Sequence, residues 1–293
     1  MTHLLNFNSL EVLLDLPIKG YNHPRFDWTG KIIDVKYKGI SLAGYEKDDP
    51  KPDEYVGRGF YNEFGIERAV GFHDCGVGDW FHKIGIGLLK KDGEVYAFHH
   101  PYEIKPLEFQ VQKSDTHLII DAMSPIINGY GYKYEKELIL TENGWEVHYK
   151  LDNTGSKIIE TDEYNHNFIM IGEEEIGRDY ILKFPFPLQP GIKGEALNPK
   201  DVIEINDNEI KLFDKPDSPF FYSFLNGEDL VDAEWKLLNL KTGIGITEKG
   251  SFLTSKVNLW GWKGAISPEL FIKIKVEPGE SMSWNRKFSI FEI

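Results

Sequence analysis

The sequence predicts an all-β protein, specifically one large and mainly antiparallel β-sandwich. Short segments that alternate apolar with charged residues occur along most of the chain, as expected for antiparallel sheets with one face in water. Turn signals such as Lys91-Asp-Gly93, Glu142-Asn-Gly144 and Asn153-Thr-Gly155 separate several of them. No amphipathic helix of ordinary length, linker or fixed-period repeat is recognisable. We therefore expect a single domain that spans residues 1–293.

The expected strands are short runs rich in β-branched and aromatic residues, and a last one ends at Phe291. In order, the others are Leu10–Leu16, Lys31–Tyr37, Val95–Phe98, Glu108–Gln112, His117–Asp121, Gly131–Leu140, Trp145–Leu151, Thr161–Ile171, Tyr180–Phe184, Asp201–Ile205, Glu209–Phe213, Phe220–Phe224, Ala233–Leu238, Ile244–Thr247, Lys256–Trp260 and Leu270–Val276.

Two stretches between these strands are expected to be loops. The charged, proline-rich residues 48–53 are typical of an exposed loop. The stretch Gly57–Gly65 contains too many glycines for an ordinary strand, and it carries Arg58 and Glu63. Such backbone freedom favours a loop that approaches a ligand or another segment closely.

Composition excludes several classes of partner. The net charge of −14 argues against nucleic acid and against an anionic membrane surface, because both are polyanions. The single cysteine, Cys75, excludes an intrachain disulfide framework and fits a reducing, cytoplasmic compartment. No apolar run is long enough to span a bilayer, and the first residues lack the pattern of a secretory signal.

A metal or nucleotide site is not expected. His73, Cys75 and His82 could bind a metal in principle, but their spacing matches no established zinc pattern. The glycines between residues 76 and 87 do not form a dinucleotide fingerprint, because no helix is expected to follow them.

The strand Thr161–Ile171 contains the most informative histidine. In a strand, Tyr164, His166 and Phe168 would share one face, and Asn165 and Asn167 would point to the other. A histidine on an aromatic face is either a buried group that has found a partner or part of a site. The residues of this strand alone leave both interpretations open.

Two longer segments resemble the galactose mutarotase (aldose 1-epimerase) superfamily. Residues 151–168, Leu-Asp-Asn-Thr-Gly-Ser-Lys-Ile-Ile-Glu-Thr-Asp-Glu-Tyr-Asn-His-Asn-Phe, are similar to its polar turn and its strand with Asn-His and an aromatic residue. Residues 267–284 are similar to its ending, where a Glu on a late strand precedes a Pro-Gly-Glu turn and a strand with Trp. Loops such as Arg25–Gly30 and Phe81–Gly87 indicate a divergent branch.

The resemblance implies a chemistry and two catalytic residues. Members of this superfamily interconvert sugar anomers with one acid and one base and without a metal or redox cofactor. Matching the motifs implies His166 as the acid and Glu269 as the base, on a concave face of the sandwich. We expect burial to raise the pKa of Glu269 and a carboxylate to keep His166 charged. Glu163 would point away from His166.

The remaining site candidates lie in loops rich in glycine and aromatic residues, or could stack on a sugar. They are Arg25, Arg58, Glu63, His82, Lys83 and Trp260. Three other functions stay open. A non-catalytic carbohydrate-binding protein could use the same fold. A hexose-phosphate epimerase would need a basic cluster, which this acidic chain disfavours. A lyase or hydrolase could use paired carboxylates.

Overall fold

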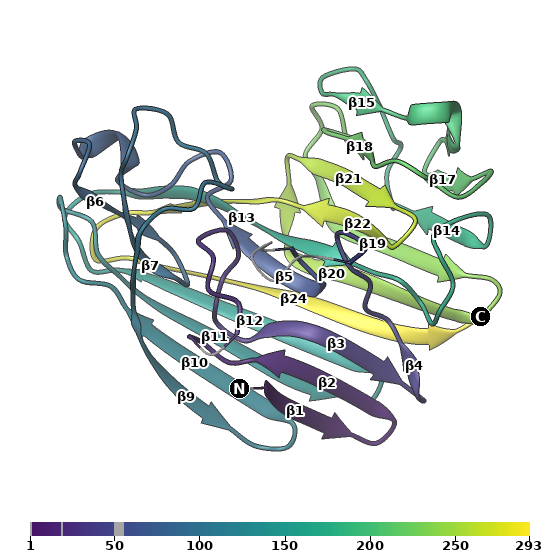
Figure 1. Ribbon diagram of the computed structural model, residues 1–293, viewed down its shortest axis with the longest axis horizontal. Helices are drawn as coiled ribbons and strands as arrows, with labels where there is room; N and C mark the ends of the chain where they lie inside the picture. The colour runs from purple at the N-terminus through teal and green to yellow at the C-terminus, as the bar shows by residue number, and fades with distance from the viewer. Residues whose placement is uncertain (1, 19, 50–55) are drawn as a thin grey trace.

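The computed structural model describes residues 2–18, 20–49 and 56–293. Within these ranges the chain folds into β-strands that form two large and two small sheets, with two short 3-10 helices (Figure 1). The helices are η1 (Phe72–Asp74) and η2 (Pro199–Asp201). Neighbouring strands run antiparallel, for example β11 against β12 and β5 against β13. The predicted all-β, mainly antiparallel fold is confirmed.

The largest sheet has ten strands and supplies one layer of the sandwich. In spatial order they are β16 (Ile203–Asn206), β17 (Glu209–Leu212), β14 (Tyr180–Lys183), β19 (Val231–Asn239), β20 (Ile244–Thr254), β24 (Ser281–Glu292), β12 (Gly144–Asn153), β11 (Tyr132–Thr141), β10 (His117–Met123) and β9 (Glu108–Lys113). Burial alternates along β11, as the alternation of its apolar and charged residues predicts.

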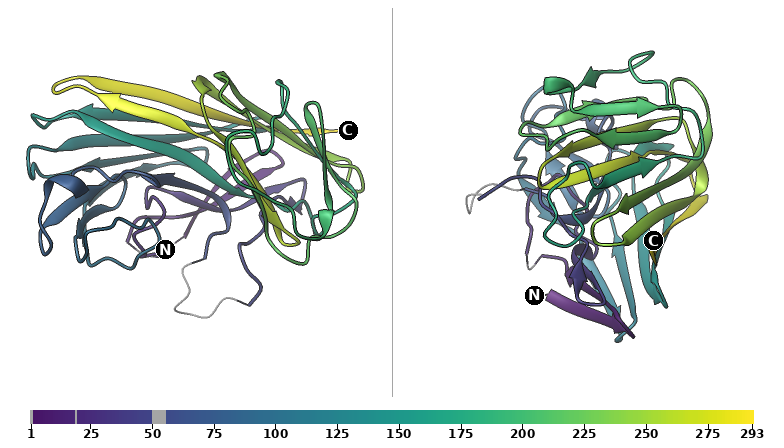
Figure 2. Two further views of the ribbon diagram at one scale, coloured as in Figure 1. Left: turned by 90° about the horizontal axis from the view of Figure 1, so that it is seen from above. Right: turned by 90° about the vertical axis from the view of Figure 1, so that its right-hand side faces the viewer.

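The second layer is a seven-stranded sheet. Its order is β1 (Thr2–Phe7), β2 (Leu10–Asp15), β3 (Lys31–Tyr37), β5 (Gly59–Phe64), β13 (Ile159–Phe168) and β23 (Ile272–Val276), and β4 (Ile40–Ser41) pairs with β3. The purple strands of this sheet lie beneath the teal and yellow strands in the left view of Figure 2. Phe60 packs edge-on against Trp145 of the other sheet, with ring centroids 5.0 Å apart. The main hydrophobic core therefore lies between the two sheets.

Two smaller sheets complete the molecule. One contains β15 (Ala196–Leu197), β18 (Phe220–Tyr222), β21 (Val257–Trp262) and β22 (Ala265–Leu270). The other contains β6 (Trp80–Lys83), β7 (Gly87–Lys90) and β8 (Ile104–Pro106). A bridge between Ile169 and Ile266 brings β22 beside the end of β13. His166 of β13 and Glu269 of β22 both lie near this junction.

The prediction of a loop at Gly57–Gly65 is wrong for most of its length, because residues 59–64 form β5. Gly59 has a φ of 62°, and a Cβ there would lie 2.3 Å from the carbonyl oxygen of Ile32. Glycine is required here by the close approach of β3, which the sequence did not distinguish from loop freedom.

The prediction of a strand at Val95–Phe98 is also wrong, since no strand forms there. Tyr96 instead stacks on Tyr102 and donates a 2.7 Å hydrogen bond to the carbonyl of Gly65. The aromatic residues of this segment fix a loop. Most of the loop predicted at residues 48–53 lies outside the described residues. Within the described ranges, no helix is long and apolar enough to cross a membrane.

Candidate active site

Strand β13 separates two different environments. On one face Tyr164, His166 and Phe168 form a column of rings, in which His166 stacks on Phe168 with a centroid distance of 3.9 Å. On the other face Glu163 and Asn165 point between the large sheets, where Asn62 donates a hydrogen bond to each. Both faces are buried, so β13 lacks the alternating exposure of a surface strand. The alternation predicted for this strand, with Glu163 opposite His166, is confirmed.

His166 lies in an aromatic enclosure and contacts Glu269. Its Nε2 is 3.4 Å from Oε1 of Glu269, and each residue keeps 4% of its surface exposed. The rings of Trp260 and Phe26 both meet the imidazole in a T-shaped arrangement, with centroid distances of 5.3 and 6.2 Å. The Nδ1 atom of His166 is buried and has no hydrogen-bond partner among the described residues. An unpaired buried nitrogen of this kind is an unusual and costly feature.

Glu269 reaches this position from β22, near the end of that strand. The predicted strand Leu270–Val276 corresponds to β23, and Glu269 belongs to the strand before it. Its cross-strand partner is Asn258 of β21, which hydrogen-bonds to its carboxyl group, and Ser267 Oγ lies 3.5 Å from Oε1. Burial raises the pKa of Glu269 to about 8, while the charge of Arg25 opposes the increase. The expected raised pKa has its cause in this burial.

The histidine differs from the expectation of a charged group. Burial lowers the pKa of His166 well below its usual value, and the nearby positive charge of Arg25 lowers it further. A carboxylate is present, as expected, but Glu269 itself favours its protonated form at neutral pH. Burial therefore favours a neutral His166 beside a protonated Glu269, a pair that shares one proton.

A cluster of ion pairs adjoins the aromatic column. Arg25 contacts Glu46 at 2.8 Å and Glu63 at 3.3 Å. Glu63 is fully buried and accepts a 2.7 Å hydrogen bond from Tyr164, while its Oε1 has no partner among the described residues. Lys83 is buried nearby, and its pKa is lowered by burial and raised in part by the charge of Glu63. Of the sequence-based candidates, Arg25 and Glu63 are thus brought into contact beside Tyr164, and Lys83 lies near enough for its charge to interact with that of Glu63.

Two of the other candidates lie elsewhere. His82 donates to or accepts from Ser124 at 2.7 Å and packs against Tyr132, on the opposite face of β6 from Lys83. Arg58 is exposed, and its Nε donates to the carbonyl of Ile33 at 2.9 Å. No described contact joins either residue to His166. They were predicted as site residues because they lie in stretches rich in glycine and aromatic residues, but His82 belongs to β6 and Arg58 immediately precedes β5.

Several residues of the enclosure were missed. Tyr164 was placed on the correct face but was not proposed as a site residue, and Asn258 and Phe26 were not considered. Recognition of the hairpin β21–β22 in the sequence would have placed Asn258 opposite Glu269. The position of Phe26 depends on the folding of a loop and leaves no local pattern.

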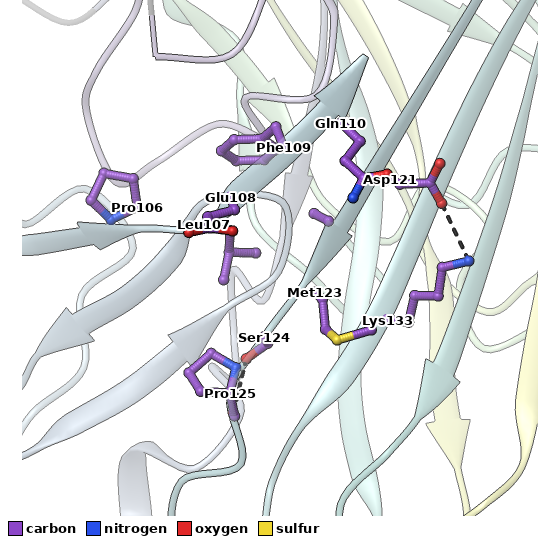
Figure 3. A pocket seen from close by; sticks show the side chains of 11 residues that line it. Pro106, Leu107, Glu108, Phe109, Gln110, Asp121, Met123, Ser124, Pro125 and Lys133 are labelled. Atoms are coloured by element: carbon purple, nitrogen blue, oxygen red, sulfur yellow. Dashed lines mark hydrogen bonds and ion pairs between the residues drawn. The ribbon is translucent and has the colours of Figure 1, made fainter. Parts of the chain in front are cut away.

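A separate hollow of about 700 Å³ lies between β8–β9 and the ends of β10 and β11 (Figure 3). Asp121 and Lys133, which form a 3.3 Å ion pair, line one side of it. None of the candidate site residues lines this hollow. Among the described residues, no group of three or more His, Cys, Asp or Glu side chains could hold a metal ion.

Comparisons with solved structures place the fold. A proposed aldose 1-epimerase from Escherichia coli K12 is 11% identical, with a TM-score of 0.61 over 100% of this chain and 99% of that one. A protein from Synechocystis sp. PCC 6803 is 14% identical, with a TM-score of 0.60 over 100% and 96% of the chains. The chain has the galactose mutarotase-like fold.

A galactose mutarotase related enzyme from Lactobacillus acidophilus agrees, with 11% identity and a TM-score of 0.59 over 100% and 98% of the chains. No family model matches the sequence, and no curated protein matches it. The combination of a shared fold with identities this low fits a divergent branch of galactose mutarotase-like proteins. The resemblance noted in residues 151–168 and 267–284 is therefore confirmed for the fold.

Proposed function

We propose that the protein is a carbohydrate epimerase that interconverts the anomers of a sugar. The observation that carries this proposal is the contact between His166 Nε2 and Glu269 Oε1 inside an aromatic enclosure. Solved proteins of the same fold that are named as aldose 1-epimerases support it by analogy. The proposal includes a cytoplasmic location, which rests on the single cysteine.

The proposed reaction uses the single proton of this pair. Neutral His166 accepts the proton of the anomeric hydroxyl, and Glu269 donates its proton to the ring oxygen. The bond between the anomeric carbon and the ring oxygen breaks, its electron pair stays on the ring oxygen, and a carbonyl forms. Rotation of the carbonyl and reversal of the proton transfers close the ring on its other face. Both reacting oxygens are attached to one carbon, so two side chains in contact can reach them.

In the starting state of this scheme His166 is the base and Glu269 is the acid, the reverse of the roles that the resemblance implied. Burial of an ion pair in an apolar enclosure costs more than burial of the two neutral groups, unless other polar groups satisfy the charges. Arg25 is the cation whose charge acts most strongly on the pair, and two carboxylates already neutralise it. Each group still acts once as an acid and once as a base in a full cycle.

The surroundings favour a neutral sugar over a phosphorylated one. A phosphate group needs cations that are not already paired. Arg25 is shared by Glu46 and Glu63, and Lys83 donates to the hydroxyl of Tyr96 at 3.0 Å. Rings such as that of Trp260 can instead pack against the C–H face of a pyranose. These pairings argue against the hexose-phosphate alternative.

The test is saturation-transfer NMR on a panel of free aldoses, with the wild-type protein and two variants. We expect wild type to accelerate anomer exchange, and His166→Ala or Glu269→Gln each to reduce the acceleration by roughly 10²–10⁴-fold. A matched control exists in the His148–Glu146 pair, which has the same chemistry at 3.2 Å on the outer face of β12. His148→Ala should retain activity.

Each outcome decides between the functions. Exchange that survives both site variants would contradict the assignment of this pair. Sugar binding without accelerated exchange would favour a non-catalytic carbohydrate-binding protein. A complete lack of response to every sugar would refute the proposed function and leave the fold unaffected.

A further inference from the structure

The strands β13 and β22 separate just before Glu269. At Ile266 the two strands are joined by backbone hydrogen bonds in both directions with Ile169, at 3.1 and 3.0 Å. Beyond this point the backbone contact ends, because the amide of Asn167 donates to Ser267 Oγ at 2.9 Å and not to a carbonyl. The carbonyls of Pro268 and Leu270 point to the same side as that of Ile266, since carbonyls alternate along a strand.

Two side chains take the place of the missing backbone contacts. Nδ2 of Asn167 donates a 3.0 Å hydrogen bond to the carbonyl of Pro268. Nη2 of Arg286, on β24 of the opposite sheet, donates a 2.9 Å hydrogen bond to the carbonyl of Leu270. Pro268 and Leu270 are the residues immediately before and after Glu269. The backbone on both sides of the glutamate is therefore held by side chains from two different strands.

A third residue couples the two donors. Glu248 accepts a 2.9 Å hydrogen bond from Asn167 on one oxygen, and Arg286 donates to its other oxygen. Arg286 also contacts Glu163 at 2.7 Å. Arg286, Glu163 and Glu248 are all completely buried. In this setting the guanidinium cannot shift without leaving a buried charge unpaired, which is strongly unfavourable.

We infer that Asn167 and Arg286 are positioning residues that, linked through Glu248, set the place of the Glu269 carboxyl group against His166. This inference rests on the proposed function, which gives Glu269 its role. Neither positioning residue touches the His166–Glu269 contact in the structure. The groups that do face Glu269 are His166, Ser267 and Asn258. Arg25, Glu63 and Lys256 act on it through their charges, and Tyr164 also interacts with it electrostatically.

The test measures Glu269 directly and needs no substrate. Protein labelled with ¹³C at the glutamate carboxyl groups is titrated by NMR, and Glu269→Gln identifies the resonance. In Asn167→Ala the carboxyl group should relax toward water, and its pKa should fall by about one unit, which is tenfold in its ionisation constant. Arg286→Lys should shift it in the same direction, because a lysine cannot hold Glu163, Glu248 and the carbonyl of Leu270 together.

Asn153→Ala is the matched control. Its Nδ2 also donates two hydrogen bonds, here to the backbone carbonyls of Lys157 and Val276, each 2.8 Å long, and the bond to Val276 is buried. It should destabilise the fold as Asn167→Ala does but leave the pKa of Glu269 unchanged. An unchanged pKa in a folded Asn167→Ala or Arg286→Lys protein would overturn the inference, and so would an equal shift in the control. Failure of the proposed function would appear separately, as wild-type protein that exchanges no sugar.

Discussion

The protonation of Glu269 should be visible in the stability of the protein. Burial raises the pKa of Glu269 in the folded protein to about 8, whereas the ordinary pKa of a glutamate, which applies to the unfolded chain, is 4.5. Between these two values the folded state binds one more proton than the unfolded state. Glu269 therefore makes its full contribution to stability below the lower pKa. The free energy of unfolding decreases as the pH rises above that value, and the contribution is lost once the pH has passed through the higher pKa.

The magnitude follows from the two pKa values. One unit corresponds to about 1.4 kcal/mol, so the full shift amounts to roughly 5 kcal/mol. Glu269→Gln removes the ionisable group and keeps its size. The free energy of unfolding of the variant minus that of wild type should then rise by about 1.4 kcal/mol for each pH unit between about pH 5 and 8.

Urea unfolding at several pH values measures this difference. His166 is present in both proteins, so its own titration largely cancels in the comparison. Glu160→Gln is the control, since Glu160 lies on β13, the strand that carries His166, but in contact with water, paired with Arg68 at 2.7 Å. Its stability difference from wild type should not grow over the same range. Parallel stability curves for Glu269→Gln and wild type would show that the glutamate ionises normally and would refute the proposed proton distribution.

Two further variants test the packing and the sugar site. Gly59→Ala should lower the free energy of unfolding by about 1–3 kcal/mol more than Gly279→Ala, because both residues have positive φ but only the first would press a Cβ onto a backbone oxygen; equal losses in thermal or urea unfolding would contradict this reason. Trp260→Ala should weaken sugar binding by roughly tenfold in titration calorimetry, about 1.4 kcal/mol, while Trp80→Ala on β6 should not; unchanged affinity would remove Trp260 from the site.

Local pattern was sufficient for the central strand. Its period-two alternation placed His166 with the aromatic residues and Glu163 on the other side, because a strand allows no other arrangement. The same rule, applied to β6, would have separated His82 from Lys83. The proposed role of Glu269 rests on resemblance, since nothing in its local sequence distinguishes it from a surface carboxylate.

Partner choice between sheets could not be predicted. Arg286 follows an ordinary polar pattern on β24, and only the folded structure shows that it pairs with Glu163 and Glu248 across the core. The contact of Arg25 with Glu63 joins residues 38 positions apart and depends on where one loop folds. Such pairings are set by the packing of whole sheets, so no short window of sequence contains them.

A spectroscopic measurement is needed to establish which of His166 and Glu269 carries the proton. A neutral His166 with a protonated Glu269 and a charged His166 with an ionised Glu269 hold the same number of protons. Both arrangements therefore predict the same bell-shaped dependence of rate on pH, whose limits belong to the pair as a whole. Kinetics cannot distinguish them, but the two ring nitrogens of histidine can.

We expect ¹⁵N NMR at about pH 7 to show one protonated and one bare nitrogen for His166, because burial disfavours the charged ring. His166→Ala assigns the signal. Two equivalent protonated nitrogens would mean that the enclosure stabilises an ion pair, with Glu269 as the resting base. In that case the dipoles and charges around the pair, above all those of Asn258 and Arg25, would have to outweigh the loss of hydration.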